Sequence, residues 1–149
     1  MAALVKLKPL EELFTGRSSV LLGRVVLEFK PDDVRRLFSG LIEALGPDGF
    51  FVSTLSATDL PEAGRVRLDY FVVLLPEEET VVFRTYLLRD KPVIQSVHDL
   101  VPGALPGECE AYDLLGVVFE GNPHLRRGFL APEDAVELGE YPLRKDSRV

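Results

Sequence analysis

The chain has 149 residues, 46% of them hydrophobic, and a formal net charge of −7. This length is typical of one compact domain that folds without disulfides, and the single cysteine, Cys109, supplies too few thiolates for an iron–sulfur cluster or a structural zinc site. The negative charge argues against nucleic acid or an anionic membrane surface as the primary partner, since both attract clustered lysine and arginine.

The first 90 residues are predicted to form an α+β domain. A short helix over 9–14, which depends on tertiary contacts at that length, is followed by a first strand within 20–29. Residues 31–45 repeat apolar side chains every three or four positions, which predicts one buried helical face. Pro31 suits the first helical position and Gly46 the end of this helix.

Three further strands are predicted over 50–56, 65–75 and 80–88, where β-branched and aromatic residues are frequent. In the second of these, apolar and polar residues alternate, as in a half-buried strand. The short link over 76–79 indicates an antiparallel hairpin. The fold class expected is a two-layer α+β domain, with a mostly antiparallel four-stranded sheet covered by helices.

Residues 91–149 are expected to form short helices and an extended docking tail, within the same structural unit. Ser96 followed by Asp99 is typical of the start of a helical turn, and a second helix is predicted over 108–115, ended by Gly116. Beyond Phe119, frequent prolines and glycines leave little room for long helices or paired strands. We therefore expect this tail to lie over another surface.

Two segments carry a family resemblance. Residues 108–127 read ECEAYDLLGVVFEGNPHLRR and residues 141–146 read YPLRKD. The first resembles the signature of the complex I C-subunit family, the 30 kDa subunit family, which has counterparts in membrane-bound hydrogenases, and the second resembles that family's tail. The sequence departs from the family pattern at four positions, which indicates a divergent branch: Cys109 stands in place of Arg, Leu115 of an aromatic, Asn122 of His and His124 of an acidic residue.

The resemblance implies a non-catalytic peripheral-arm subunit that docks on a hydrogenase-like large subunit and supports assembly and electron transfer to quinone. It also implies that iron–sulfur clusters and quinone, or a nickel–iron centre, belong to partner subunits, with no cofactor or metal in this chain. No apolar run approaches the ~20 residues that span a bilayer, and the start carries no convincing signal peptide. We expect a peripheral location on the cytoplasmic side of the membrane, with membrane contact only through the complex.

Two alternatives remain open. The first is that the chain is the equivalent subunit of a membrane-bound energy-converting hydrogenase. The second is that it is a freestanding α+β domain that binds a small molecule between its helices and its sheet and regulates an enzyme. No catalytic constellation is evident, because Glu108 and Glu110, two residues apart, do not face each other on a helix. His98 and His124 are isolated in sequence and are interpreted as ordinary polar contacts.

The predicted subunit interface draws on both segments that carry the resemblance. Arg126 and Arg127 are the expected anchors, because guanidinium groups make fork-shaped contacts to carboxylates and carbonyls. Gly116 and Gly121 are expected to allow a positive φ or the close approach of another chain, because glycine has no side chain. The full predicted set is Glu108, Glu110, Tyr112, Asp113, Gly116, Phe119, Gly121, Pro123, Leu125, Arg126, Arg127, Pro142, Leu143, Arg144 and Lys145.

Overall fold

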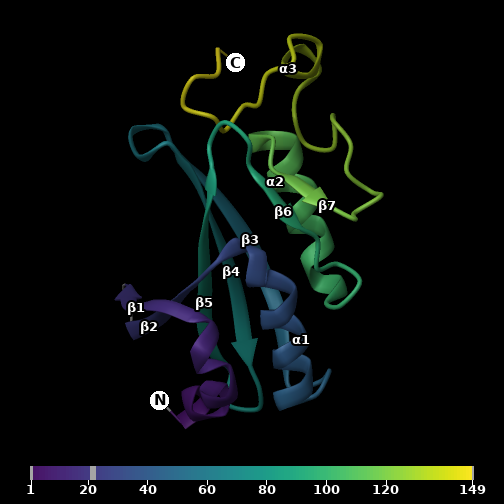
Figure 1. Cartoon of the computed structure of the whole chain (residues 1–149). Helices are drawn as coiled ribbons and strands as arrows, with labels where there is room; N and C mark the ends of the chain where they lie inside the picture. Colours follow the sequence, from purple (N-terminus) through teal and green to yellow (C-terminus); the bar gives the residue numbers. More distant parts are fainter. Residues whose placement is uncertain (1, 21–22, 149) are drawn as a thin grey trace.

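The computed structural model describes residues 2–20 and 23–148, and its centre is a five-stranded sheet (Figure 1). The strand order is β1-β2-β5-β4-β3, and every neighbouring pair is antiparallel except β2–β5. The strands are β1 (Phe14–Val20), β2 (Arg24–Phe29), β3 (Phe50–Leu60), β4 (Arg65–Leu74) and β5 (Glu79–Leu88). The mostly antiparallel α+β class is confirmed, with five strands where four were expected.

The additional strand is β1, whose sequence FTGRSSV lacks the β-branched and aromatic density of the other strands. It lies at the sheet edge and pairs only with β2. The helix expected over 9–14 is a longer 3-10 helix, η1 (Ala2–Leu13), which ends where β1 begins. Residues 21 and 22, part of the expected first strand, lie outside the described residues.

The helix predicted over 31–45 is present as the 3-10 turn η3 (Pro31–Asp33) followed by α1 (Val34–Leu45). Val34, Leu37, Phe38 and Leu41 are all buried, as their spacing predicted. The Gly46 N–H donates to the Ile42 carbonyl (2.8 Å), and its positive φ of 79° ends the helix. The predicted β4–β5 hairpin is also confirmed.

The second half of the chain contributes a small parallel sheet. β6 (Val93–Gln95) pairs with β7 (Val118–Glu120), a pairing that the proline- and glycine-rich sequence did not predict. The helical turn expected near Ser96 forms, since the Val97 carbonyl accepts N–H groups from Leu100 and Val101 (3.0 and 2.9 Å). The remaining elements are η4 (Pro61–Ala63), η5 (Pro102–Ala104), α2 (Leu105–Leu115) and α3 (Glu133–Glu137).

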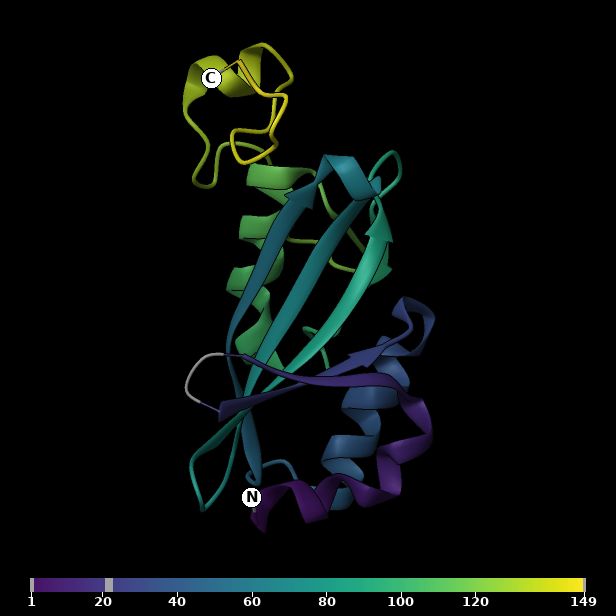
Figure 2. The same ribbon diagram turned by 90° about the vertical axis from the view of Figure 1, so that its left-hand side faces the viewer.

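Both long helices, α1 and α2, lie on the same face of the sheet (Figure 1), and the opposite face is toward the viewer in Figure 2. α2 begins three residues before the predicted start and packs closely on β3. A Cβ added to Gly107 would lie 2.7 Å from the Leu55 Cβ, so the absent side chain permits this approach. Buried apolar residues from both halves of the chain belong to one core cluster.

The last part of the chain, residues 123–148, is called the C-terminal lobe below. It begins beside α2, where the Cys109 thiol lies 3.7 Å from the His124 carbonyl oxygen, and then continues beyond the C-terminal end of α2 (Figures 1 and 2). It contains α3 and otherwise irregular backbone. Its end returns to the body of the protein, where the Leu143 N–H donates to the Leu114 carbonyl (2.9 Å). None of the helices in the described part of the chain is long and apolar enough to cross a membrane.

Candidate functional site

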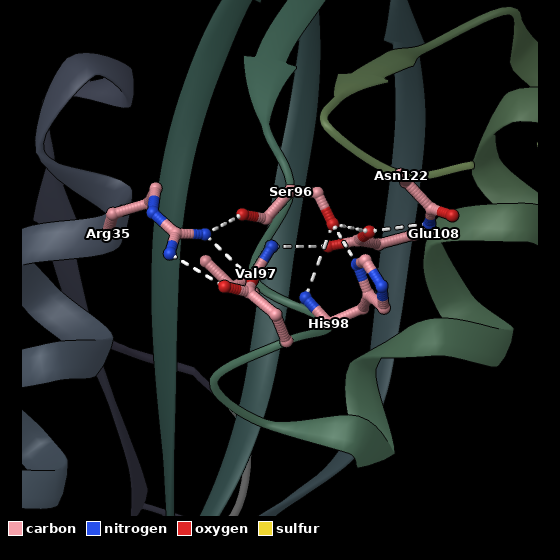
Figure 3. Close-up of polar contacts among 7 residues, drawn as sticks. Arg35, Ser96, Val97, His98, Glu108 and Asn122 are labelled. Carbon is pink, nitrogen blue, oxygen red and sulfur yellow. Dashed lines mark hydrogen bonds and ion pairs between the residues drawn. The ribbon is translucent and has the colours of Figure 1, made fainter. Parts of the chain in front are cut away.

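The carboxylate of Glu108, in the first turn of α2, lies at the centre of a buried polar network (Figure 3). The residue has no exposed surface. Its Oε1 accepts hydrogen bonds from the Ser96 hydroxyl (2.5 Å) and from the Asn122 side-chain amide (2.9 Å). Its Oε2 accepts the Val97 N–H (2.9 Å). Glu108 therefore holds the chain after β6 and the turn after β7 against α2.

The network reaches α1 through Arg35 (Figure 3). The Arg35 guanidinium donates to the Ser96 carbonyl (2.6 Å) and makes a two-pronged contact with Asp99 (2.8 Å for each bond). The hydrogen bonds from Arg35 to the Asp99 carboxylate lower the pKa of Asp99 to about 2. The network thus joins the two long helices to the small parallel sheet.

The two histidines, which the sequence suggested were isolated, meet beside this network. Their rings pack edge to face with centroids 5.7 Å apart. The His98 Nδ1 lies 2.9 Å from the Ser96 hydroxyl, and the His124 N–H donates to the Asn122 side-chain oxygen (2.8 Å). Within residues 2–20 and 23–148, no three His, Cys, Asp or Glu side chains are grouped so as to hold a metal ion.

A second buried carboxylate, Asp113, organises the C-terminal lobe. It has no exposed surface and accepts backbone N–H groups from Gly128 (2.8 Å), Leu130 (2.5 Å) and Ala131 (2.7 Å). Arg127 adds an ion pair at 3.2 Å. Burial by itself raises the pKa of Asp113, but these hydrogen bonds outweigh burial, so the pKa lies below its ordinary value.

The end of the lobe is attached to the sheet by a third carboxylate, Asp59 near the end of β3. Arg89 donates two hydrogen bonds to Asp59 (2.7 and 2.9 Å), and the Lys145 N–H donates a third (2.8 Å). Asp146 lies 3.3 Å from Arg89 on its other side. The Arg89 contacts, against the opposing effect of burial, lower the pKa of Asp59.

The structure divides the predicted interface residues into inward- and outward-facing groups. Glu108, Asp113 and Phe119 are buried, and their contacts lie within this chain. Half-buried positions are Tyr112, Gly116, Leu125, Arg127, Pro142 and Arg144. Exposed positions are Glu110, Gly121, Pro123, Arg126, Leu143 and Lys145.

Several of the half-buried residues pack inside the lobe. Arg127 lies over the Tyr141 ring at 4.2 Å, and its guanidinium also donates to the Glu140 carbonyl. Gly116, at a positive φ of 79°, ends α2, and a Cβ there would lie 3.1 Å from the Tyr141 ring. Arg127 therefore has an internal structural role, while the other expected anchor, Arg126, remains exposed.

Sequence reasoning missed Ser96 and Asn122 as hydrogen-bond donors to Glu108, and it also missed Arg35, Asp59 and Arg89. Asn122 was noted only as a departure from the family pattern, and its role is now evident from its two hydrogen bonds. Another departure, Cys109, is buried, which raises the pKa of its thiol. The donors come from segments 11 to 14 residues away from Glu108, too far apart for a local pattern to reveal.

A hollow in the described surface lies elsewhere, between η1 and β1. It has a volume of about 680 Å³ and an apolar floor that includes Leu7, Phe14 and Leu27. Lys8, Glu11 and Arg17 stand at its sides. This hollow is separate from the Glu108 and Asp113 networks.

The chain resembles several known proteins. The C subunit of NADH-quinone oxidoreductase from Moorella thermoacetica is 38% identical over 99 residues, covering 66% of this chain and 64% of that protein. Subunit 5 of the Thermus thermophilus enzyme is 40% identical over 91 residues (58% of this chain, 42% of that protein). The C/D 2 subunit of the Aquifex aeolicus enzyme is 40% identical over 93 residues (62% and 15%). The chain thus spans less than two thirds of these relatives.

Two solved structures share the fold. One belongs to the membrane-bound sulfane sulfur reductase, an archaeal respiratory membrane complex, with a TM-score of 0.79 and 24% identity over 97% of this chain and 84% of that one. The other is a trypsin-resistant fragment of Nqo5, with a TM-score of 0.68 and 24% identity over 80% of this chain and 99% of that one. The family model of the respiratory-chain NADH dehydrogenase 30 kDa subunit matches residues 27–149. Because this match takes in the second half of β2, every later strand and all of the segment from Glu108 onward, the chain belongs to the 30 kDa subunit family of respiratory-chain NADH dehydrogenase, the C-subunit family of complex I.

Proposed function

We propose that the chain is a non-catalytic peripheral-arm subunit of a complex I-like respiratory oxidoreductase. In this role it docks on the hydrogenase-like large subunit and supports assembly and electron transfer to quinone. Family membership supports the assignment to such a complex. The C/D 2 relative, of which this chain matches 15%, favours a D-type chain as the neighbour, because its name joins a C-type and a D-type subunit in one protein.

The observation that carries the proposal is the way two buried carboxylates of one helix order the segment that shows the family signature. Glu108 and Asp113 turn inward and together accept six backbone or side-chain hydrogen bonds from neutral donors, three each. Exposed side chains such as Arg126 and Leu143 lie on segments that hydrogen bonds attach to α2. A preorganised surface loses less conformational entropy on binding, as a permanent contact between two subunits requires.

Under this proposal, the chain contributes by holding neighbouring subunits in place. Iron–sulfur clusters and quinone, or a nickel–iron centre, are held by partner subunits, and this chain keeps a neighbouring redox site in productive geometry. It lies peripherally on the cytoplasmic side of the membrane and contacts the bilayer only through the complex.

The test is affinity purification of the tagged chain from gently solubilised native membranes, followed by mass spectrometry and by iron and nickel analysis. Recovery of a hydrogenase-like large subunit with iron–sulfur partners is the expected result. Nickel in the sample would assign the chain to the alternative, a membrane-bound energy-converting hydrogenase. Recovery of the chain alone would overturn the subunit proposal.

A second candidate, a freestanding regulatory domain that binds a small molecule, is favoured only by the hollow of about 680 Å³ between η1 and β1. Pockets of this size with an apolar floor and a few polar groups are typical of small-molecule sites. The purified chain would then be a monomer or homodimer, and its Tm would rise when a binding compound from a metabolite library is added. Replacing Leu7 with Asp in the floor should abolish that rise; a rise that persists would exclude this hollow as the site.

A further inference from the structure

Two histidines that are far apart in sequence are brought together by one buried carboxylate. The Glu108 Oε1 accepts the Ser96 hydroxyl, and the Ser96 oxygen lies 2.9 Å from the His98 Nδ1 (Figure 3). The same Oε1 accepts the Asn122 side-chain amide, whose oxygen accepts the His124 N–H (2.8 Å). Each of these two arms of the network therefore ends at a histidine, and the two rings lie with their centroids 5.7 Å apart.

The hydrogen bonds of Ser96 determine which nitrogen of His98 carries a hydrogen. A hydroxyl has a single proton, and Ser96 donates it to Glu108, because a carboxylate only accepts. The contact between Ser96 and the His98 Nδ1 is therefore a hydrogen bond only if that nitrogen is the donor. The neutral His98 ring then has its lone pair on Nε2, which reaches solvent and has no hydrogen-bond partner in the described part of the chain.

Glu108 places an uncompensated negative charge behind these two histidines. Its side chain is fully buried, and its three hydrogen-bond donors are neutral. Arg35, the cation of the network, pairs with Asp99 instead, and no described residue forms an ion pair with Glu108. A buried charge without a counter-charge is costly. A cation held by the two imidazoles would supply a counter-charge at the ends of the Ser96 and Asn122 arms.

We propose that His98 and His124 form a binding site for a divalent transition-metal ion. Neutral imidazole is the commonest protein ligand for such ions, and a ligating histidine usually donates a hydrogen bond from its other ring nitrogen, as His98 does to Ser96. Two rings bound to one ion through nitrogens about 2.0–2.1 Å from it have centroids about 5–6 Å apart, and the 5.7 Å observed lies in this range. Water completes the coordination, since no third ligand is grouped with the pair among the described residues.

This site goes beyond the proposed function, and the family resemblance does not account for it. Asn122 and His124 are two of the four positions at which the chain departs from the family pattern. A third, Cys109, lies close by, with its thiol 3.7 Å from the His124 carbonyl oxygen. Burial raises the pKa of this thiol, so it stays protonated at neutral pH and is not counted as a ligand.

Metal binding is tested on the purified monomeric full chain without a histidine tag, with Zn²⁺ in calorimetric titration and Cu²⁺ in electron paramagnetic resonance. The chain has only two histidines, so a 1:1 Cu²⁺ complex with two coupled imidazole nitrogens identifies the pair. His98→Gln and His124→Gln should each weaken Zn²⁺ binding about tenfold or more and leave one coupled nitrogen. Cys109→Ser is the matched control and should leave Zn²⁺ affinity unchanged.

NMR of the imidazole nitrogens tests Ser96 as the positioning residue without any metal. The wild type should show neutral His98 protonated at Nδ1. Ser96→Ala removes the acceptor, so the Nε2-protonated form should appear and Zn²⁺ affinity should fall about tenfold. Neutral His98 protonated at Nε2 in the wild type would refute the positioning role.

Three results would overturn the metal site: no Zn²⁺ binding by the wild type, a single coupled nitrogen in its Cu²⁺ spectrum, or unchanged affinity in both histidine variants. Circular dichroism confirms that each variant is folded. If the half-buried His98 does not tolerate replacement, His124→Gln at an exposed position decides the question by the same two readouts. None of these results bears on the subunit proposal, which purification from native membranes tests separately.

Discussion

Replacing Glu108 with Ala should lower the free energy of unfolding by about 3–7 kcal/mol. The substitution leaves three buried donors without an acceptor: the Ser96 hydroxyl, the Val97 N–H and the Asn122 amide. A buried donor left unpaired costs about 1–3 kcal/mol, and the Ser96 hydroxyl can rotate to another acceptor, so the two remaining donors account for about 2–6 kcal/mol. The cavity left by the missing methylene and carboxylate adds about 1 kcal/mol.

The measurement is urea unfolding followed by far-UV circular dichroism, because the chain has no tryptophan to report by fluorescence. Glu110→Ala provides a control on the same helix, since Glu110 is exposed and its removal should change stability by no more than about 0.5 kcal/mol. Glu108→Gln should fall between the two, at about 1–3 kcal/mol, because its amide group can replace one carboxylate oxygen as an acceptor but not both.

The reasoning would be refuted by a Glu108→Ala variant as stable as Glu110→Ala. Such a result would mean that the three donors find water or other acceptors at no cost. Equal losses for Gln and Ala at position 108 would instead show that the carboxylate charge, and not the number of acceptors, dominates the network.

Three further predictions concern the helices and the lobe. Arg35→Ala should lower the free energy of unfolding by about 1–2 kcal/mol, because Arg35 loses its bonds to Asp99 and to the partly buried Ser96 carbonyl after β6. Arg36→Ala is the control: the Arg36 side chain is 64% exposed, so the free energy of unfolding should change by no more than about 0.5 kcal/mol. Urea unfolding of both variants measures the difference. Gly107→Ala should lower the free energy of unfolding by about 1–3 kcal/mol in the same assay, because the new Cβ would lie 2.7 Å from the Leu55 Cβ. Gly40→Ala should be near neutral, because its Cβ would meet only the flexible end of a leucine side chain and alanine favours the helix by about 1 kcal/mol. Equal losses for the two variants would refute the argument that the contact with Leu55 makes Gly107 necessary. Because the folded-state pKa of Asp113 is depressed, its stabilisation of the lobe is fully present above the unfolded pKa of about 3.9 and is lost as pH falls through the lower folded value. Hydrogen exchange should therefore show the lobe amides of the wild type losing protection in that acid range, and Asp113→Asn should show no such step.

The main elements of the fold could be predicted from sequence because their signals are local. The three- and four-residue spacing over 31–45 specified a helix and its buried face, and the alternation over 65–75 specified a half-buried strand. Both follow from the fixed geometry of the backbone, in which side chains return to the same face after each turn or every second residue. The segment from Glu108 onward indicated the family by residue type and order alone.

β1 and the small parallel sheet depended on contacts that no local pattern records. The sequence of β1 has low strand propensity, and the strand exists because β2 supplies its hydrogen bonds. β6 and β7 have only three residues each and pair across the whole of α2. The Lys145 N–H reaches Asp59 across 86 residues of sequence, a distance at which only the folded core sets the geometry.

The sequence by itself determined that acidic residues would lie on the second helix, but only the tertiary structure decided what each of them does. Glu108 and Glu110 are the same residue type, and at 3.6 residues per turn they project about 200° apart. Packing of α2 on β3 turned Glu108 into the interior, where desolvation makes every missing donor costly, and left Glu110 in water. The physical reason is that burial is a property of the contacts between elements, and a helix sequence does not contain the surface against which it will pack.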